Sequence, residues 1–490
     1  MTPVHQTLTA KYLATCWVFA FLFGLLLMPG HLSFETPETE TVQNFVRTGH
    51  FGSEAPLTLY RRGIDGKFYS GHELGANIIH LPIAYLSVAL SRPAVPFKRV
   101  FGLLSGTAGV SVFAITFTLC LSLVARLGVP VAFAGWRLFV LMVCGQYLIY
   151  ALQLPDVSLS CPFFAAAALM WVRIESGDAG RYAWLVLGVC LGVLCFIKVT
   201  NGIFVIVAAV WIAVRLIRKP RPARIDVVFF GIGWLPGAGA IAWWNWVRSG
   251  SIFGTLYEPW ETASSASLQT FVNHFCATFV SPGLGLLAYS PYLIALAPFL
   301  LRRQSGLRNS LALLVIGSLL LTSIRLSLNP FWNGQHGWGI RYYVPWLPLL
   351  AVLGVAIWWD RKSASRWKML LGALLIAGLA INASVVVGNW LYDLSHCGFE
   401  PWSFSTLNTC AVEAAPRNVL RTLGVAIPEV SVEEGSDTNR FVSNRLNVWW
   451  FAARTLGVPP ALSWSIGFAL CLLVIVAARQ VQRQAKRDEA

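Results

Sequence analysis

The sequence is poor in charged residues, and above all in acidic ones. Of its 490 residues 12% are charged and 56% are hydrophobic, and only 22 are aspartate or glutamate. An ordinary soluble domain carries about 25% charged residues, so a soluble protein of this length could not hide so much apolar surface. Repeated runs of about 20 apolar residues instead predict an all-α polytopic membrane protein.

Three further features are missing. The ten cysteines form no C-x-x-C pair or Cys/His spacing, and most lie inside apolar runs, so a zinc site is not indicated. The first apolar segment ends in MPGH without an A-x-A cleavage site, which favours an uncleaved anchor over a signal peptide. No internal repeat stands out, which weakens the interpretation as an inverted-repeat transporter.

The net charge of +15 is explained by the topology of a membrane protein. Arginine and lysine lie mainly in short connections between apolar runs, as the positive-inside rule describes for cytoplasmic loops, so we expect no nucleic-acid partner. The hydropathy pattern predicts about twelve spans, with both termini and the basic loops on the cytoplasmic side. These spans are 12–29, 99–125, 132–151, 157–174, 182–198, 201–217, 225–247, 286–301, 308–325, 342–359, 368–388 and 459–478.

One more apolar segment, 75–91, is short and contains His80 and Pro82. If it crossed the membrane, every basic loop would move to the outer side. The charge bias therefore predicts an interfacial or re-entrant helix that closes the first outer loop.

Under this topology most acidic residues lie outside. Four outer segments are long enough to build a site: 30–98, 248–285, 326–341 and 389–458. The chain then divides into a transmembrane catalytic module (1–390, with the first outer loop at 30–98), a small extracytoplasmic capping segment (391–458), and a last span with a basic cytoplasmic tail (459–490). In the capping segment, Cys397 and Cys410 could pair in an oxidising compartment or remain free.

The first outer loop begins with candidate catalytic acids. Glu35, Glu38 and Glu40 follow the first span, and Pro37 is suited to opening a helix there. Glu38 and Glu40 could instead simply favour the positive end of that helix dipole. Glu35 precedes the helix and lies nearest the membrane, so we favour it as the carboxylate that takes a proton from an acceptor hydroxyl.

Further along the same loop, the segment 60–75 has four glycines, and Asp65 lies among bases that include Lys67. Such bases can hold a phosphate. Equally, this segment could be a solvated loop that meets lipid headgroups.

Two charged residues lie at the outer ends of later spans. Asp156 occupies a short turn, where an ionisable residue at membrane depth indicates a functional site, although it could also cap the following helix. Lys198 ends a span, and it could extend to the headgroups or face an anionic substrate.

The loop 329–348 is the most distinctive of the outer segments. It places Trp338, His336, Arg341 and Tyr342 among glycines directly before a span. An interfacial aromatic belt accounts for the aromatic residues but not for His336 and Arg341. An arginine here can bind a phosphate through two hydrogen bonds, and the aromatics beside it can stack on a sugar or hold a prenyl tail.

The order of these features resembles the GT-C integral-membrane glycosyltransferases, which include protein mannosyltransferases and the lipid A aminoarabinose transferase. That order is a single span, an acidic loop ending in GKFYS, an outer aspartate, a WN…R…G exit, SPGLGLLAYSP, and a GxRYYxPxLP loop. The resemblance covers roughly residues 12 to 390. It implies a GT-C-like helical bundle in the bacterial plasma (inner) membrane, with juxtamembrane helices in the first extracytoplasmic loop.

The resemblance also implies an activity. These enzymes take a sugar from a polyprenyl-phosphate donor and invert it at the anomeric carbon, here with a lipid, glycan or protein acceptor. It implies that Asp156 lines an extracytoplasmic active site and that Arg341 binds the phosphate. The acidic pair typical of the first loop is absent, so the base is open between Glu35, Glu38 and Glu40. Some relatives bind a divalent metal ion, for which Glu35 and Asp156 would be the ligands here.

Two other functions remain as alternatives. A transporter or flippase for a lipid-linked saccharide would share the apolar spans and the basic contacts. A polysaccharide polymerase or ligase would also have a large outer loop.

Overall fold

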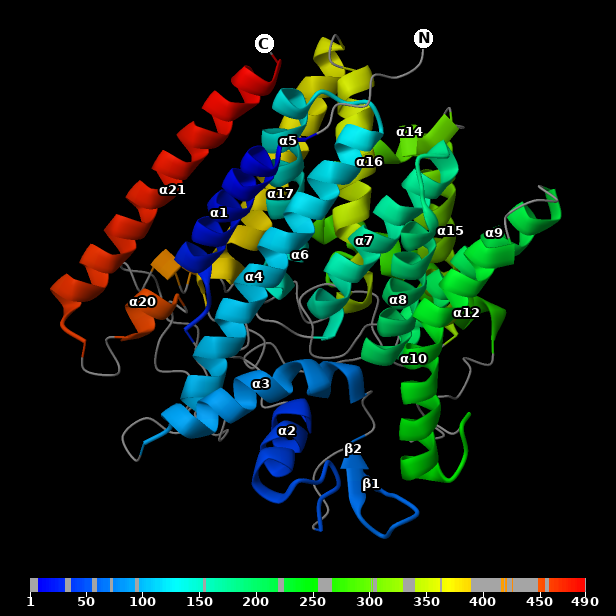
Figure 1. Cartoon of the computed structure of the whole chain (residues 1–490). Helices are drawn as coiled ribbons and strands as arrows, with labels where there is room; N and C mark the ends of the chain where they lie inside the picture. The colour runs from blue at the N-terminus through cyan, green and yellow to red at the C-terminus, as the bar shows by residue number, and fades with distance from the viewer. Residues whose placement is uncertain are drawn as a thin grey trace.

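The structure is a computed structural model, and it describes residues 8–30, 37–54, 60–70, 74–92, 97–152, 156–218, 224–253, 267–300, 302, 306–328, 340–361, 364–388, 416–417, 419–420, 425, 448–453 and 458–489. Most of its helices run side by side in one bundle, and a small group of elements lies across one end (Figure 1). We call this the hairpin end, since a β-hairpin lies there. The opposite end, where the first helix begins and the last helix ends, is the terminal end.

The longer helices are α1 (Ala10–Leu27), α2 (Pro37–Thr48), α3 (Leu74–Leu90), α4 (Phe97–Arg126), α5 (Val131–Val143), α7 (Asp156–Ser176), α8 (Arg181–Ile197), α9 (Gly202–Arg218), α10 (Arg224–Ser249), α12 (Leu268–Val280), α14 (Tyr292–Leu300), α15 (Gly306–Ser327), α16 (Leu347–Asp360), α17 (Ser365–Val387) and α21 (Pro460–Glu489). Short helices are α6 (Tyr147–Ala151), α13 (Leu286–Tyr289), α20 (Trp449–Ala452) and the 3-10 helices η1 (Val199–Asn201) and η2 (Arg341–Trp346). Each predicted span coincides with one helix or with two consecutive ones. Eight of these helical stretches are long and apolar enough to cross a membrane, so the prediction of a polytopic helical membrane protein is confirmed.

Two of the predicted spans are interrupted. The span 286–301 divides into α13 and α14 at Ser290 and Pro291, where the proline has no N–H to donate. The span 132–151 divides into α5 and α6 around Gly145, which the sequence analysis did not predict. The two interruptions pack together, since a Cβ atom on Gly145 would lie only 2.7 Å from Ser290 Oγ.

The segment 75–91 forms α3, which lies across the hairpin end rather than along the bundle (Figure 1). Its Ala76, His80 and Ala84 are buried, whereas Tyr85 and Leu86 are exposed. This arrangement agrees with the expectation of a helix that does not cross the membrane.

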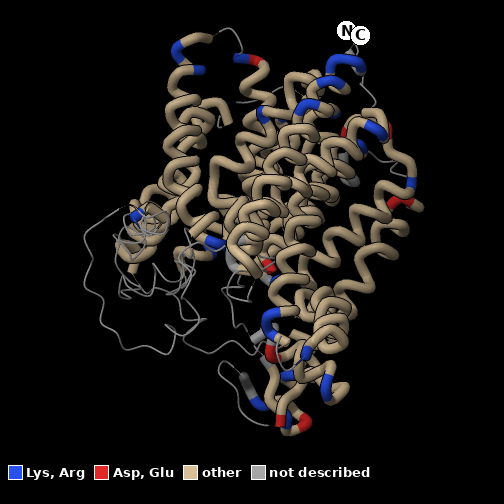
Figure 2. The backbone as a smooth tube through the Cα atoms, turned by 90° about the vertical axis from the view of Figure 1, so that its left-hand side faces the viewer, with Lys and Arg blue, Asp and Glu red and all other residues tan. Residues whose placement is uncertain are grey.

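The two ends of the bundle differ in charge. Lysine and arginine outnumber the acids at the terminal end, both signs gather at the hairpin end, and fewer charges lie along the length between them (Figure 2). Arginines pair with three acids of the terminal end: Arg126 with Asp178, Arg215 with Glu175, and Arg308 with Asp360. The start of α1 and the end of α21 both lie at this end (Figure 1). That it faces the cytoplasm stays a prediction.

The first outer loop departs from the all-helical expectation. Strands β1 (Tyr60–Arg62) and β2 (Phe68–Ser70) form an antiparallel hairpin, in which Tyr60 lies opposite Ser70. Gly66 adopts a φ of +82° in the turn, a conformation that glycine reaches without steric cost. The sequence indicated only a turn-rich loop, because two strands of three residues are too short to show an alternating pattern.

The predicted capping segment lies almost wholly outside the described residues, as do Cys397 and Cys410. Its last part forms α20, which is hydrogen-bonded to the end of α1. Trp449 Nε1 donates to the Leu25 carbonyl at 2.8 Å, and Trp450 Nε1 donates to the Leu26 carbonyl at 2.9 Å. The proposed boundaries near 390 and 458 stay predictions.

Helices α8 and α10 approach so closely that their backbones touch. A Cβ atom on Gly188 would lie 2.2 Å from the carbonyl oxygen of Phe230, and one on Gly237 would lie 2.4 Å from the backbone of Gly192. Small residues at such interfaces allow the van der Waals contacts that hold membrane helices together. Trp244 of α10 packs against Tyr69 of the first-loop hairpin, so the contact between α8 and α10 also supports the hairpin.

We expect Gly237→Ala to lower the thermal unfolding midpoint of the detergent-solubilised protein. The added methyl group has no room, and overpacking costs about 1–3 kcal/mol. Gly239→Ala is the matched control, because a Cβ atom on Gly239 would meet nothing within 4 Å. Equal unfolding midpoints for the two variants would show that α8 and α10 do not approach each other closely at Gly237.

Candidate functional site

Four of the predicted site residues meet at the hairpin end. Asp156 begins α7, Lys198 directly follows α8, and Arg341 and Tyr342 open η2. Lys198 forms an ion pair with Asp156, and its Nζ lies 5.4 Å from the centroid of the Tyr342 ring. The guanidinium carbon of Arg341 lies 5.7 Å from the same centroid, and Asp156 is within electrostatic reach of Arg341. These four residues form what we call the charge cluster.

Asp156 both starts its helix and binds a cation. Its Oδ1 accepts a hydrogen bond from the N–H of Val157 at 2.7 Å, and its Oδ2 accepts one from Lys198. Asp156 therefore lies at the start of α7 and binds Lys198; that it lines an active site stays a prediction.

Lys198 does not extend to the headgroups. Only 8% of the residue is exposed, and extended backbone at the end of α8 (φ −157°) turns it toward α7. Asn201 fixes the following turn, since its Nδ2 donates to Ser160 Oγ at 2.8 Å. The ammonium group is thus held in one place beside the Tyr342 ring.

Removing Lys198 should destabilise the protein through its partner. In Lys198→Met, the Asp156 carboxylate, which is only 14% exposed, loses the cation that binds its Oδ2, and within the cluster the electrostatic interaction with Arg341 remains. Breaking a buried ion pair in this way costs about 3–5 kcal/mol, so we expect a lower thermal unfolding midpoint in detergent.

The double variant Lys198→Met/Asp156→Asn tests that reason. It removes the buried charge as well, and its midpoint should return most of the way to that of the unchanged protein. If the double variant is as unstable as Lys198→Met alone, the loss of stability in Lys198→Met does not come from the broken ion pair.

Arg341 brings an unsatisfied donor into the cluster. Its Nε is buried and has no hydrogen-bond partner among the described residues. A buried donor without a partner costs about 1–3 kcal/mol, which an anionic ligand would recover. Lys198 and Arg341 together face one carboxylate, so these residues of the cluster carry a net positive charge. This arrangement suits an anion such as a phosphate.

Two further residues at this site were not predicted from the sequence. Tyr150, buried in α6, interacts electrostatically with Arg341. Gln146 donates from Nε2 to the carbonyl of Ile340, the residue before Arg341. A polar residue inside the apolar span 132–151 was a signal that could have pointed to Gln146. No comparable signal marks Tyr150.

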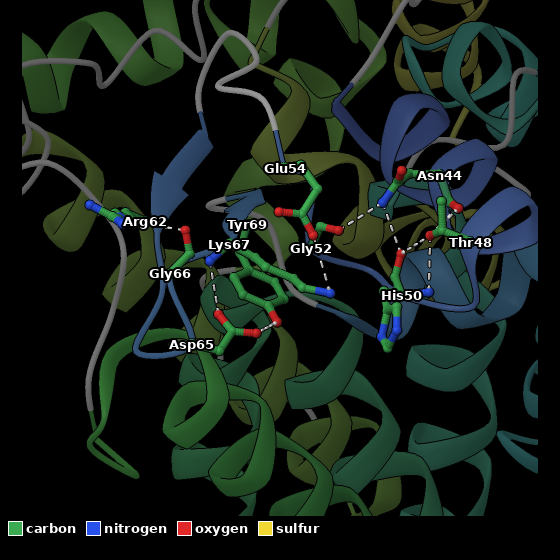
Figure 3. A network of polar contacts seen from close by, with 10 residues as sticks. All are labelled: Asn44, Thr48, His50, Gly52, Glu54, Arg62, Asp65, Gly66, Lys67 and Tyr69. Atoms are coloured by element: carbon green, nitrogen blue, oxygen red, sulfur yellow. Dashed lines mark hydrogen bonds and ion pairs between the residues drawn. The ribbon is translucent and has the colours of Figure 1, made fainter.

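Asp65 and Lys67 form polar contacts within the hairpin and with Glu54 beside it (Figure 3). Tyr69 donates its hydroxyl to Asp65 Oδ2 at 2.7 Å, and the Lys67 N–H donates to Oδ1 at 3.1 Å. Lys67 Nζ lies 3.5 Å from Glu54. Limited burial acts to raise the pKa of Asp65, but these hydrogen bonds and the Lys67 ammonium lower it below its ordinary value.

The hairpin in turn docks on α10. The Tyr69 ring meets Trp244 edge to face, with centroids 5.5 Å apart, and Phe51 meets the same tryptophan at 5.8 Å. A substrate role for Asp65 and Lys67 stays a prediction.

The candidate base lies outside the part of the chain that the structure describes. Glu35, His336 and Trp338 are not among the described residues, and for Glu38 only the backbone is described. Helix α2 does begin at Pro37, as predicted, so Glu38 lies in its first turn. Whether these residues approach the charge cluster stays a prediction.

The described residues around Asp156 do not by themselves form a site for a divalent metal, and Glu35, the other expected ligand, lies outside them. Both oxygens of its carboxylate already accept hydrogen bonds, one from an ammonium group. Across the described ranges, no group of three His, Cys, Asp or Glu could hold a metal ion. We therefore derive no step through a metal.

Comparison with known proteins identifies the fold. The sequence matches no protein-family model and no curated protein. Its structure matches a crystal structure of ArnT from Cupriavidus metallidurans bound to undecaprenyl phosphate, with a TM-score of 0.50 and 14% identity over 96% of this chain and 77% of that chain. The same protein in the apo state matches with a TM-score of 0.50 and 15% identity, over 95% and 76%. The chain therefore has the fold of these ArnT structures, which agrees with the predicted helical membrane bundle.

Proposed function

We propose that this chain with a GT-C fold is a membrane glycosyltransferase that uses a polyprenyl-phosphate sugar as donor. The charge cluster is the observation that carries this proposal. It holds two fixed cations against one carboxylate, at the end of an apolar bundle, with a buried guanidinium donor left to bind an anion. One ArnT structure with this fold holds undecaprenyl phosphate, which is the kind of lipid anion that such a cluster fits.

The donor phosphate binds between Arg341 and Lys198. The guanidinium group offers planar paired donors to phosphate oxygens, while the ammonium group adds a second positive charge near the same Tyr342 ring. Asp156 holds Lys198 in place and prevents two uncompensated cations from facing each other.

The reaction is a single displacement at the anomeric carbon. A first-loop carboxylate, Glu35 in our assignment, takes the proton of an acceptor hydroxyl, with Glu38 as the alternative. The acceptor oxygen forms a bond to the anomeric carbon as the bond from that carbon to the phosphate oxygen breaks. The electron pair leaves with the prenyl phosphate, and Arg341 and Lys198 stabilise the negative charge that develops on it.

The orientation in the membrane follows from the distribution of charge. The terminal end carries the excess of arginine and lysine, and the positive-inside rule supports a cytoplasmic position for this end. The hairpin end, with the charge cluster, then faces the extracytoplasmic side of a bacterial inner membrane. Lipid, glycan and protein hydroxyls are all candidate acceptors on that side.

Mass spectrometry of lipid-linked saccharides tests the function. A bacterial strain that lacks this chain should accumulate one polyprenyl-phosphate sugar relative to the same strain carrying it. The purified chain in proteoliposomes should release free polyprenyl phosphate from that donor when acceptor is present. A chain that moves the donor between leaflets without consuming it would be a flippase, and the proposal would fall.

A further inference from the structure

Gln146 lies buried at the interruption between α5 and α6. A glutamine side chain in this apolar region is costly, because its amide must leave water. Its Nε2 donates to the carbonyl of Ile340 at 3.1 Å, across a separation of 194 residues. Its Oε1 is buried without a hydrogen-bond partner among the described residues. An apolar side chain of the same size would avoid that unsatisfied acceptor, so stability alone does not explain a glutamine at this position.

The residue that Gln146 holds is fixed from two sides. The N–H of Ile340 donates to the Leu284 carbonyl at 3.1 Å, from the irregular segment before α13. The carbonyl of Ile340 accepts from Gln146 and, at 3.1 Å, from the N–H of Tyr343. Ile340 itself is completely buried. The backbone from which Arg341 departs is therefore anchored to two separate segments of the bundle.

We infer that Gln146 is a positioning residue for Arg341, and this inference rests on the proposed function. By binding the Ile340 carbonyl, Gln146 fixes the peptide plane that joins Ile340 to Arg341. That plane sets the direction in which the guanidinium group leaves the backbone toward the donor phosphate. Gln146 acts through Arg341 and does not touch the substrate. The interruption of the span 132–151 places this amide beside η2.

A double-mutant cycle on the full-length protein in nanodiscs tests the inference, with undecaprenyl phosphate as the probe. Gln146→Met keeps the length of the side chain but removes the donor. We expect it to weaken binding about tenfold, which is the effect of about 1.4 kcal/mol. In an Arg341→Lys background the same substitution should change binding by less than about twofold, because the group that it positions is gone.

Asn382→Leu is the matched control. Asn382 is another buried amide, with Nδ2 donating to the carbonyls of Tyr289 at 2.9 Å and Gly378 at 2.7 Å. These two partners lie in α13 and α17 and are not members of the charge cluster, so loss of Asn382 should leave the dissociation constant unchanged even where the unfolding midpoint falls.

The outcomes separate the inference from the proposed function. If the unchanged protein does not bind undecaprenyl phosphate, the proposed donor site is wrong and the inference falls with it. If it binds, and Gln146→Met binds equally well, only the inference is wrong. An equal loss from Gln146→Met in both backgrounds would also overturn it, since the residue would then act on the fold and not through Arg341.

Discussion

Arg341→Gln is expected to lower the rate of sugar transfer by about 10²–10³-fold, with little change in the unfolding midpoint. Glutamine keeps hydrogen-bond donors but loses the charge that opposes the developing negative charge on the leaving phosphate. Removing one preorganised group that stabilises such a charge typically costs this much. The measurement is the initial rate of prenyl phosphate release by the purified protein in proteoliposomes.

Two matched variants support the interpretation of Arg341→Gln. Arg341→Lys keeps the charge but not the paired donors. Its rate should therefore lie between the rate of the unchanged protein and that of Arg341→Gln. Arg325→Gln removes an exposed arginine from the last turn of α15 and should leave the rate unchanged. A rate for Arg341→Gln equal to that for Arg325→Gln would remove Arg341 from the donor site.

Glu35→Gln is expected to lower the same rate by about 10²–10⁴-fold, the usual contribution of a positioned general base. An amide cannot take the proton of the acceptor hydroxyl. Binding of undecaprenyl phosphate should be unchanged, because the carboxylate acts on the acceptor and not on the leaving phosphate. The rate and the dissociation constant are measured on the same preparation.

Glu38→Gln, three residues along the chain, is the comparison for that variant. If Glu38 only favours the positive end of the α2 dipole, its loss should cost a few tenths of a kcal/mol in stability and leave the rate intact. If Glu38→Gln loses activity and Glu35→Gln does not, Glu38 and not Glu35 is the general base. Full activity in both variants, and in Glu40→Gln, would remove the general base from the first loop.

The placement of the spans could be predicted because the bilayer imposes it on local sequence. Apolar runs of fixed length form helices, and the basic loops alone decided against a crossing by 75–91, which forms α3 across the hairpin end. The break at Pro291 was also predictable, since a proline interrupts the hydrogen bonds of its helix. The break near Gly145 was not, because glycines are common in spans that continue.

The candidate site could be predicted only as separate residues. Asp156, Lys198 and Arg341 each stood out as a charge at the end of a span, but their meeting depends on which helices are neighbours. The Lys198–Asp156 pair and the bond from Gln146 to Ile340 join distant segments, and no local pattern encodes either. Asp65 and Lys67 show the opposite case, since their charges stood out in the sequence and are bound within the hairpin.

The most direct test is an experimental structure of the chain with undecaprenyl phosphate bound, at a resolution that places the phosphate. We expect the phosphate at the hairpin end, within hydrogen-bond distance of the Arg341 guanidinium and the Lys198 ammonium, with the prenyl chain along the apolar bundle. A phosphate bound at the terminal end, or at the hairpin end without contact to either cation, would contradict the proposed donor site.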